Sequence, residues 1–162
     1  GIKWPNDILA GGRKLAGILV ELKSGGSRTT AIIGIGINVR MPVSAEENPE
    51  QLIDRPWTDL ETHLSPELLP CNRNALASAL LDQLLAALGR FESTGFESFR
   101  SAWNQYDLLD QGQVTLEMDE KTICGIARGV SGSGELLLET SSGAVRHFHA
   151  GEVRVYRGIR AF

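Results

Sequence analysis

Three groups of residues near the start of the chain have the types and spacing needed to bind an anionic ligand. Residues 3–7 read Lys-Trp-Pro-Asn-Asp, residues 14–21 read Lys-Leu-Ala-Gly-Ile-Leu-Val-Glu, and residues 34–38 read Gly-Ile-Gly-Ile-Asn. Lysine next to glycine-rich backbone can hold a carboxylate or a phosphate at the edge of a dry pocket, where charge interactions are strong. These segments are therefore the candidates for a functional site.

Lys14 is the residue best placed to supply the charge. It stands at the start of an apolar run, shortly after a turn at Gly11 and Gly12. Gly17 lacks a side chain, so a ligand or another backbone can lie flat on this strand. The alternative is a solvated lysine that flanks a core strand, which is the commoner situation for lysine.

Gly34 and Gly36 are two residues apart, which puts them on one face of a strand together with Asn38. Glycine weakens a strand, so the pattern indicates either a closely approaching ligand or a bulge. The segment is not a dinucleotide-binding fingerprint, because Val39 stands where the third glycine belongs. Residues 5–7 taken alone are equally good turn chemistry.

In this order and at these spacings, the three segments resemble one family, the biotin protein ligases, which include bifunctional bacterial members. The family pattern is K-W-P-N-D, then K-L-A-G-I-L-V-E, then G-I-G-I-N, and all three stand here unaltered. A Gly-Glu-Val strand at 151–153 also fits the family. The resemblance is strongest over residues 2–39 and weakest over residues 41–70.

The resemblance implies a biotin–[acetyl-CoA-carboxylase] ligase. Such an enzyme joins biotin to one lysine of the biotin carboxyl carrier protein of acetyl-CoA carboxylase. The biotin carboxylate attacks the α-phosphate of Mg-ATP to give biotinyl-5′-AMP and pyrophosphate, and the carrier lysine then displaces AMP. Biotin, ATP, Mg²⁺ and the carrier protein are thus the expected substrates, cofactors and partner. Family members often form homodimers, so a homodimer is one expectation.

The resemblance also assigns residue roles, with Lys14 as the catalytic cation. The other candidates are expected to bind substrate: Gly17, Ile18, Leu19 and Val20 for biotin, Asn6 and Asp7 for the adenylate or its metal-bound phosphates, Asn38, Gly34 and Gly36 for the nucleotide, and Lys3 as a second cation. No residue is assigned as a metal ligand. His147 and His149 share a strand face, but the sequence indicates no third ligand nearby, so we expect solvated or hydrogen-bonded histidines.

The family also carries a glycine- and arginine-rich loop, G-R-G-x-x-G-R, upstream of the first motif. Neither this loop nor the first strands and helices of the catalytic domain occur in the 162 residues. We therefore expect the chain alone to be weakly active or inactive. Two alternatives stay open: a lipoate ligase or octanoyl transferase on the same fold, and a catalytically dead remnant that serves as a binding or regulatory module.

The family resemblance implies an α+β fold, and the first 110 residues show both strand and helix patterns. Residues 14–22 and 29–39 are expected to form an antiparallel hairpin, the second strand being buried on both faces. Proline-rich residues 41–70 predict an irregular connection with short helical turns. Asn72 is a candidate N-cap, and residues 95–106 predict a second helix. The first helix carries a leucine stripe that we expect to be core: Leu76, Leu80, Leu81, Leu84, Leu85 and Leu88.

Short β-like runs punctuated by glycine follow residue 110. Five of them, at 114–117, 123–130, 136–139, 145–148 and 153–156, predict a small SH3-like barrel. We predict a barrel domain over residues 111–162. By family resemblance, residues 1–110 are the C-terminal portion of a biotin/lipoate ligase catalytic domain, similar to class II aminoacyl-tRNA synthetases, with a mixed or antiparallel sheet. Arginines at 154, 157 and 160 are expected to be a solvated basic tail.

Composition limits the partners. The formal net charge is −4, which disfavours nucleic acid and anionic membranes as ligands. No apolar run approaches the roughly 18 residues of a membrane-spanning helix. Cys71 and Cys124 belong to no motif, which indicates a reducing environment, and we expect a cytoplasmic protein.

Overall fold

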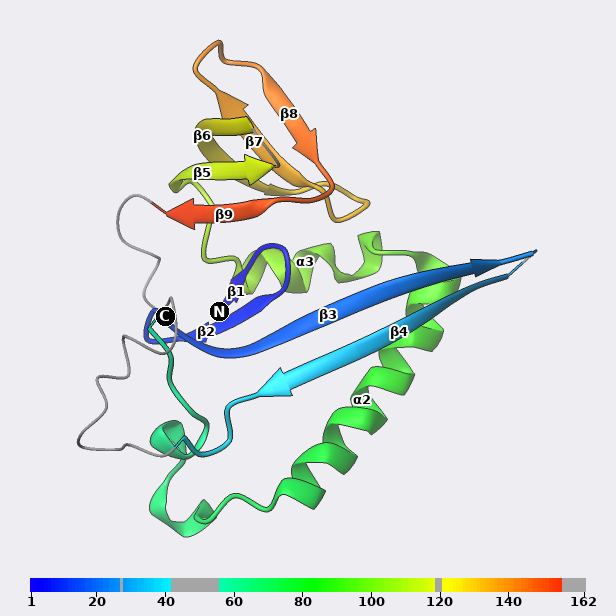
Figure 1. The fold of residues 1–162 in the computed structure, drawn as a ribbon, viewed down its shortest axis with the longest axis vertical. Coiled ribbons are helices and arrows are strands. Elements are labelled where there is room, and N and C mark those ends of the chain that lie inside the picture. Colours follow the sequence, from blue (N-terminus) through cyan, green and yellow to red (C-terminus); the bar gives the residue numbers. More distant parts are fainter. Residues whose placement is uncertain (27, 42–55, 119–120, 156–162) are drawn as a thin grey trace. The chain divides into compact units, whose positions relative to one another are not determined.

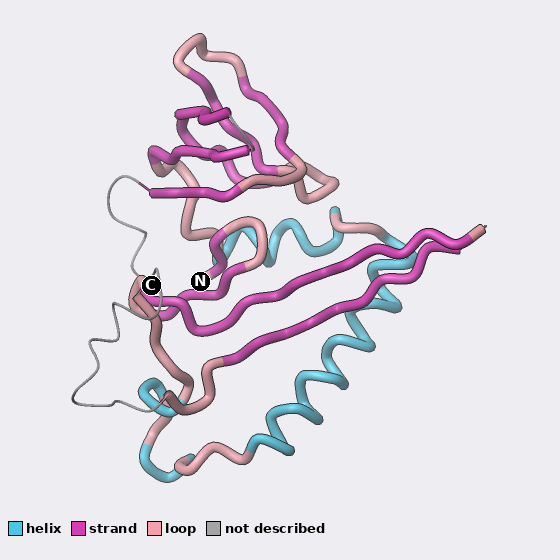
Figure 2. Tube along the Cα trace, viewed as in Figure 1, coloured by secondary structure: helices cyan, strands magenta, loops and turns pink. Residues whose placement is uncertain are grey.

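The computed structural model describes residues 1–26, 28–41, 56–118 and 121–155 (Figure 1). The chain forms two compact units, one comprising Asn6–Asn72 and the other Gly1–Pro5 with Arg73–Phe162. In sequence order, strands come first, helices follow, and strands come again at the end, as the tube in Figure 2 can be followed to show. The predicted α+β class is confirmed.

The first of these units is built on an antiparallel sheet of β2 (Asp7–Ala10), β3 (Arg13–Gly25) and β4 (Arg28–Ile37), with β3 between the other two. The predicted hairpin is confirmed, and its strands extend further toward the turn than expected (Figure 1). Gly26 has φ +60° at the turn, a conformation that glycine adopts without strain.

The expectation that the second hairpin strand is buried on both faces is wrong. No residue of β4 with a described exposure is buried, and Ile32 is 45% exposed. Strand β4 pairs with β3 on one side, and among the described residues of its compact unit no helix is longer than one turn. The described part of that unit therefore provides no second layer over the apolar run of β4.

The connection after β4 is irregular, as expected. Within its described part it contains two short 3₁₀ turns, η1 (Glu61–His63) and η2 (Pro66–Leu68). Residues 42–55 of the predicted connection lie outside the described residues.

Both predicted helices are present, as α2 (Arg73–Thr94) and α3 (Glu97–Tyr106). Helix α2 begins directly after Asn72, the expected cap position, and ends at Thr94. The next residue, Gly95, terminates the helix with a φ of +65° and an N–H that donates to the Phe91 carbonyl. Helix α3 starts two residues later than predicted.

The leucine stripe of α2 is not core, contrary to the sequence-based expectation. No residue of α2 is buried, and Leu81 and Leu85 are 56% and 67% exposed. Within the same unit the partner of α2 is α3, which has 10 residues against 22 in α2. The shorter helix reaches only the C-terminal part of the stripe, as Leu88 and Phe91 in a shared hollow show.

The five predicted barrel strands are confirmed as β5 (Gln113–Met118), β6 (Lys121–Val130), β7 (Leu136–Thr140), β8 (Val145–Phe148) and β9 (Glu152–Val155). They pair antiparallel in the order β8-β7-β6-β5-β9. Their inward side chains form the main hydrophobic core, in which Val114, Leu116 and Leu138 are fully buried. Tyr156 lies outside the described residues. None of the described helices is long and apolar enough to cross a membrane.

The start of the chain belongs to the barrel's compact unit. Strand β1 (Ile2–Lys3) forms a parallel bridge with Asp107, and the Ile2 carbonyl accepts a 2.9 Å hydrogen bond from the Leu108 N–H. Trp4 lies in the hydrophobic core at 3% exposure. The barrel, α2, α3 and residues 1–5 therefore belong to one compact unit. The domain boundary near residue 110 remains a prediction.

Candidate functional site

An ion pair between Lys14 and Asp7 is the centre of the candidate site. The Lys14 Nζ lies 2.6 Å from the Asp7 Oδ1, and the side chains are 43% and 11% exposed. A Cβ built on Gly17 would lie 3.3 Å from the Lys14 Nζ and 3.5 Å from the Asp7 Oδ1. The lysine side chain therefore folds over the glycine, and three predicted site residues meet.

A β-bulge explains how these residues come to share a face. Asp7 is paired with Gly17 and Ile8 with Ala16, but Leu9 is paired with Lys14, so Leu15 is an extra residue in β3. Without the bulge, Lys14 and Gly17 would point to opposite faces, because they are three residues apart. The bulge reverses the alternation and turns Lys14 toward Gly17 and Asp7.

Glycines continue this face across the hairpin. Gly17 is paired with Gly36, and Leu19 with Gly34, so all four residues lie on one face. A Cβ at Gly36 would meet nothing within 4 Å. The result is a floor of bare backbone two strands wide beside the lysine.

Asn6 fixes the other side of the floor. Its side-chain Nδ2 donates a 2.8 Å hydrogen bond to the Ile18 carbonyl, and its own carbonyl accepts a 2.9 Å bond from the Ile18 N–H. The Ile18 and Val20 side chains lie on the face opposite Gly17 and Leu19, because consecutive residues alternate. Of this predicted slot, only Gly17 and Leu19 share the lysine's face.

Asn38 holds the backbone of Lys14, the catalytic candidate, by hydrogen bonds. Both hydrogens of its amide are used, one on the Lys14 carbonyl at 3.2 Å and one on the Thr58 carbonyl at 3.0 Å. Its backbone N–H donates to the Leu15 carbonyl at 2.9 Å, across the bulge. Asn38 thus stabilises the bulged backbone that orients the Lys14 side chain.

Residues 56–59 also belong to the site, which the sequence did not indicate. The Lys14 N–H donates to the Pro56 carbonyl and the Thr58 N–H donates to the Lys14 carbonyl, both at 2.9 Å, so that Trp57 lies opposite Lys14 in a parallel bridge. No motif connects these segments, since Pro56 comes 42 positions after Lys14 in the sequence. The sequence feature that could have indicated a role for this segment is the apolar Trp57 directly before the polar Thr58 and Asp59.

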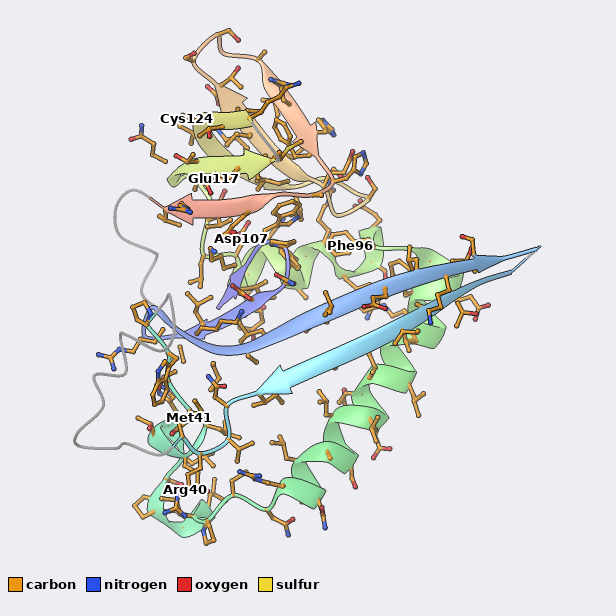
Figure 3. All side chains as sticks on the ribbon, in the orientation of Figure 1. Arg40, Met41, Phe96, Asp107, Glu117 and Cys124 are labelled. Atoms are coloured by element: carbon orange, nitrogen blue, oxygen red, sulfur yellow. The ribbon has the colours of Figure 1, made fainter. Side chains whose placement is uncertain are left out.

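Asp59 ties this segment to the end of β4. Its carboxylate accepts hydrogen bonds from the backbone N–H of Met41 at 2.8 Å and from the N–H and hydroxyl of Thr62 at 2.9 and 2.7 Å. These donors, the Met41 N–H foremost, lower the pKa of Asp59. Figure 3 labels Arg40 and Met41 at this point, where Arg40 lies 3.8 Å from Glu61.

Two family models match the chain. Residues 1–38 match the Biotin/lipoate A/B protein ligase family, and residues 113–156 match the Biotin protein ligase C terminal domain. The Bifunctional ligase/repressor BirA of Escherichia coli is 37% identical over 153 residues, which are 94% of this chain and 45% of that protein. The Biotin--[acetyl-CoA-carboxylase] ligase of Mycobacterium tuberculosis is 31% identical over 146 residues, 90% of this chain and 49% of that protein.

Solved structures agree with the sequences. The apo biotin protein ligase of Aquifex aeolicus superposes with a TM-score of 0.77 at 29% identity, covering 97% of this chain and 65% of that one. The same ligase in complex with biotin and ATP gives a TM-score of 0.74 at 28% identity, covering 97% and 62%. The chain belongs to the biotin protein ligase family.

As a member of the biotin protein ligase family, the chain spans about half the length of the curated relatives it matches. The family's SH3-like C-terminal domain corresponds to β5–β9, which confirms the predicted barrel. The family's first motif, residues 3–7, crosses from one compact unit to the other between Pro5 and Asn6. Lys3 thus lies in a different unit from Lys14.

The expectation of solvated or hydrogen-bonded histidines is confirmed, although Glu135 is a nearby carboxylate that we did not expect. Glu135 Oε2 is 3.2 Å from the His147 Nδ1, and Oε1 is 3.0 Å from the His149 Nε2. The described residues nevertheless contain no metal-holding group of three such side chains.

Arg154 pairs with Glu117 at 3.0 Å, while residues 157 and 160 lie outside the described chain. Both cysteines are free, and Figure 3 labels Cys124 on the barrel.

Proposed function

We propose that the full-length protein is a biotin protein ligase that works in two steps. A biotin carboxylate oxygen attacks the α-phosphorus of ATP, the bond to pyrophosphate breaks, and biotinyl-5′-AMP forms. The amine of a carrier-protein lysine then attacks the acyl carbon, AMP leaves, and the amine loses a proton as the amide forms. The acceptor is the biotin carboxyl carrier protein of acetyl-CoA carboxylase.

The observation that carries this proposal is the ammonium of Lys14 held above the Gly17 backbone, 2.6 Å from Asp7. Both steps concentrate negative charge where carboxylate and phosphate oxygens meet. A cation stabilises that charge best when it is oriented before the reaction begins. The bulge, the hydrogen bond from Asn38 to the Lys14 carbonyl and the ion pair with Asp7 provide this orientation.

Each substrate has a proposed place on this surface. Biotin lies along the glycine floor at Gly17, beside Leu19, with Ile18 contributing backbone. Asn6 and Asp7 contact the adenylate or the metal-bound phosphates of ATP. Mg²⁺ enters as Mg-ATP.

The nucleotide lies toward the end of β4 in this proposal. Gly34 and Gly36 leave room above β4 for the nucleotide to approach, and Asn38, the residue directly after this strand, holds the nucleotide. Lys3 is proposed as a second cation for the phosphates.

A ligand-dependent melting experiment tests the choice of acid, because one matching family model covers both biotin and lipoate chemistry. Biotin at about 100 times its dissociation constant adds about 2.7 kcal/mol of stability, which raises Tm by several degrees. We expect this shift with biotin and none with lipoic acid in the full-length protein. A shift with lipoic acid alone would refute the biotin assignment.

A transfer assay separates an enzyme from a catalytically dead binding module. The full-length protein is supplied with Mg-ATP, biotin and apo carrier protein, and biotin on the carrier is followed by mass spectrometry. We expect complete biotinylation by the full-length protein and no more than a trace by the 162-residue chain. Biotin binding without any transfer by the full-length protein would establish the binding module instead.

A further inference from the structure

We propose that Asp59 is a positioning residue, which holds residues 56–60 against the backbone of Lys14 and thereby orients the catalytic ammonium. The kinetic part of this inference rests on the proposed ligase function. Asp59 touches no substrate in the proposal above, and it acts through Lys14. Both residues, and all those that connect them, lie within the compact unit Asn6–Asn72.

This segment runs beside Lys14 at the bulge of β3. The Lys14 N–H donates to the Pro56 carbonyl, and the Lys14 carbonyl accepts from the Thr58 N–H, both at 2.9 Å. The same carbonyl accepts a 3.2 Å bond from the Asn38 amide, and the Leu60 N–H donates to the Asn38 carbonyl at 2.7 Å. Because a bulge interrupts the regular ladder, these bonds set the direction of the Lys14 backbone and hence of its side chain.

The Asp59 carboxylate fixes the segment from the side away from Lys14. It belongs to a residue that is 7% exposed. Its Oδ2 accepts the N–H of Met41, labelled in Figure 3, at 2.8 Å. Its Oδ1 accepts the N–H and the hydroxyl of Thr62 at 2.9 and 2.7 Å. The three bonds join the segment to the chain that follows β4 and to η1.

The arrangement of these donors requires a carboxylate. Donors approach both oxygens, and an amide of the same shape has one oxygen and one NH₂ group. In Asp59→Asn the NH₂ faces either the Met41 N–H or the Thr62 donors, so at least one of these hydrogen bonds is lost. The adjacent Thr58 then loses its fixed place beside Lys14.

The matched control is Glu61→Gln, which makes the same change from carboxylate to amide two residues away. Glu61 Oε1 accepts the Cys71 N–H at 2.9 Å, a bond that a glutamine oxygen can keep. This bond leads toward α2 and not to Lys14. The control therefore alters charge and a backbone contact in the same compact unit without loosening residues 56–60.

The kinetic readout is biotin-dependent pyrophosphate release by the full-length protein. We expect kcat to fall about 3- to 10-fold in Asp59→Asn, the loss that corresponds to displacing the ammonium by a few tenths of an ångström. KM for biotin stays within about twofold, since a uniform binding loss would raise KM instead. Glu61→Gln keeps both parameters. Equal kinetics in the two variants would overturn the proposal.

Combining the substitution with Lys14→Ala separates positioning from general damage. A residue that acts through Lys14 has nothing left to orient once the ammonium is gone, so the two losses are not additive. We expect Asp59→Asn to change the residual rate of Lys14→Ala by less than about twofold. The same fold-loss in both backgrounds would overturn the proposal.

Amide hydrogen exchange gives a readout that does not depend on catalysis. The Thr58 N–H reports its bond to the Lys14 carbonyl, and the Ala127 N–H, bonded to the Gly112 carbonyl in the barrel, reports global unfolding. In Asp59→Asn we expect exchange at Thr58 to quicken more than exchange at Ala127. Equal acceleration of the two amides, or none at Thr58, would also overturn the proposal.

Thermal unfolding shows whether each variant is folded at the assay temperature. If Asp59→Asn is not, Thr62→Val replaces it, since this change removes the hydroxyl bond alone, and the same comparisons apply with a loss in kcat of about 2- to 3-fold. A wild-type protein that forms no adenylate would refute the proposed function, and the exchange rates would still decide whether Asp59 holds the segment against Lys14.

Discussion

Adding one methyl group at Gly17 is the sharpest available test of the site geometry. A Cβ at this position lies 3.3 Å from both the Cε and the Nζ of Lys14, closer than side chains normally tolerate, so the lysine end must move by a few tenths of an ångström. The backbone itself accepts alanine, because Gly17 has no positive φ. Gly17→Ala therefore displaces the ammonium and leaves the fold intact.

The change is expected to act in opposite directions on stability and activity. Replacing glycine by alanine where the backbone permits it stabilises a protein by about 0.4–1 kcal/mol, because the unfolded chain loses freedom. A misplacement of about 1 Å costs about 100-fold in rate. A shift of a few tenths of an ångström should then lower adenylate formation about 3- to 10-fold.

The assay compares Gly17→Ala with Gly25→Ala in the full-length protein. Gly25 lies on the same strand β3, and a Cβ there meets nothing within 4 Å. Pyrophosphate release and thermal unfolding are measured on both variants. The reasoning is refuted if Gly17→Ala keeps wild-type kcat, or if the control loses activity to the same extent.

Two further substitutions probe features away from the ammonium. Hydrogen bonds from Ser133 and His147 hold the pKa of Glu135 at about 2 against its usual 4.5. The resulting stability is present above about pH 4.5 and is lost as the pH falls toward about 2, so Glu135→Gln should flatten the acid side of a Tm-versus-pH curve, while Glu92→Gln should not. Asp59→Asn should destabilise the protein by about 2 kcal/mol in urea unfolding, against no change for the exposed Asp82→Asn; equal midpoints would contradict this.

The parts of the fold that the sequence predicts well are those with local periodicity. The barrel strands are short and bounded by glycines, so their positions follow from alternation and turn chemistry alone. The helix from Arg73 to Thr94 likewise follows from its cap, its leucine spacing and Gly95. In each case the deciding interactions lie within a few residues of one another.

Burial was predicted less well, because it depends on what covers an element. The leucines of α2 and the apolar run of β4 have the pattern of buried segments, yet Leu85 is 67% exposed and Ile32 is 45% exposed. Periodicity shows which face is apolar and does not supply a partner for it. Those expectations failed for this reason.

The candidate site was predicted in its members but not in its geometry. The motifs named Lys14, Gly17 and Asp7, and the structure brings them together. The bulge at Leu15 that aligns them is invisible in the sequence, because a strand with or without it has the same composition. The Trp57–Thr58 segment was missed because its pairing with β3 is a tertiary contact without any motif.

The most direct test of the central claim is the rate of biotinyl-5′-AMP formation by full-length Lys14→Ala, measured beside Arg13→Ala. Arg13 is the neighbouring exposed cation on the same strand, so the pair separates a fixed ammonium from general positive charge. A cation aligned with transition-state charge is worth about 10²–10³ in rate, and we predict a loss of that size for Lys14→Ala alone. Near-wild-type adenylation by Lys14→Ala, or an equal loss in Arg13→Ala, would contradict the account.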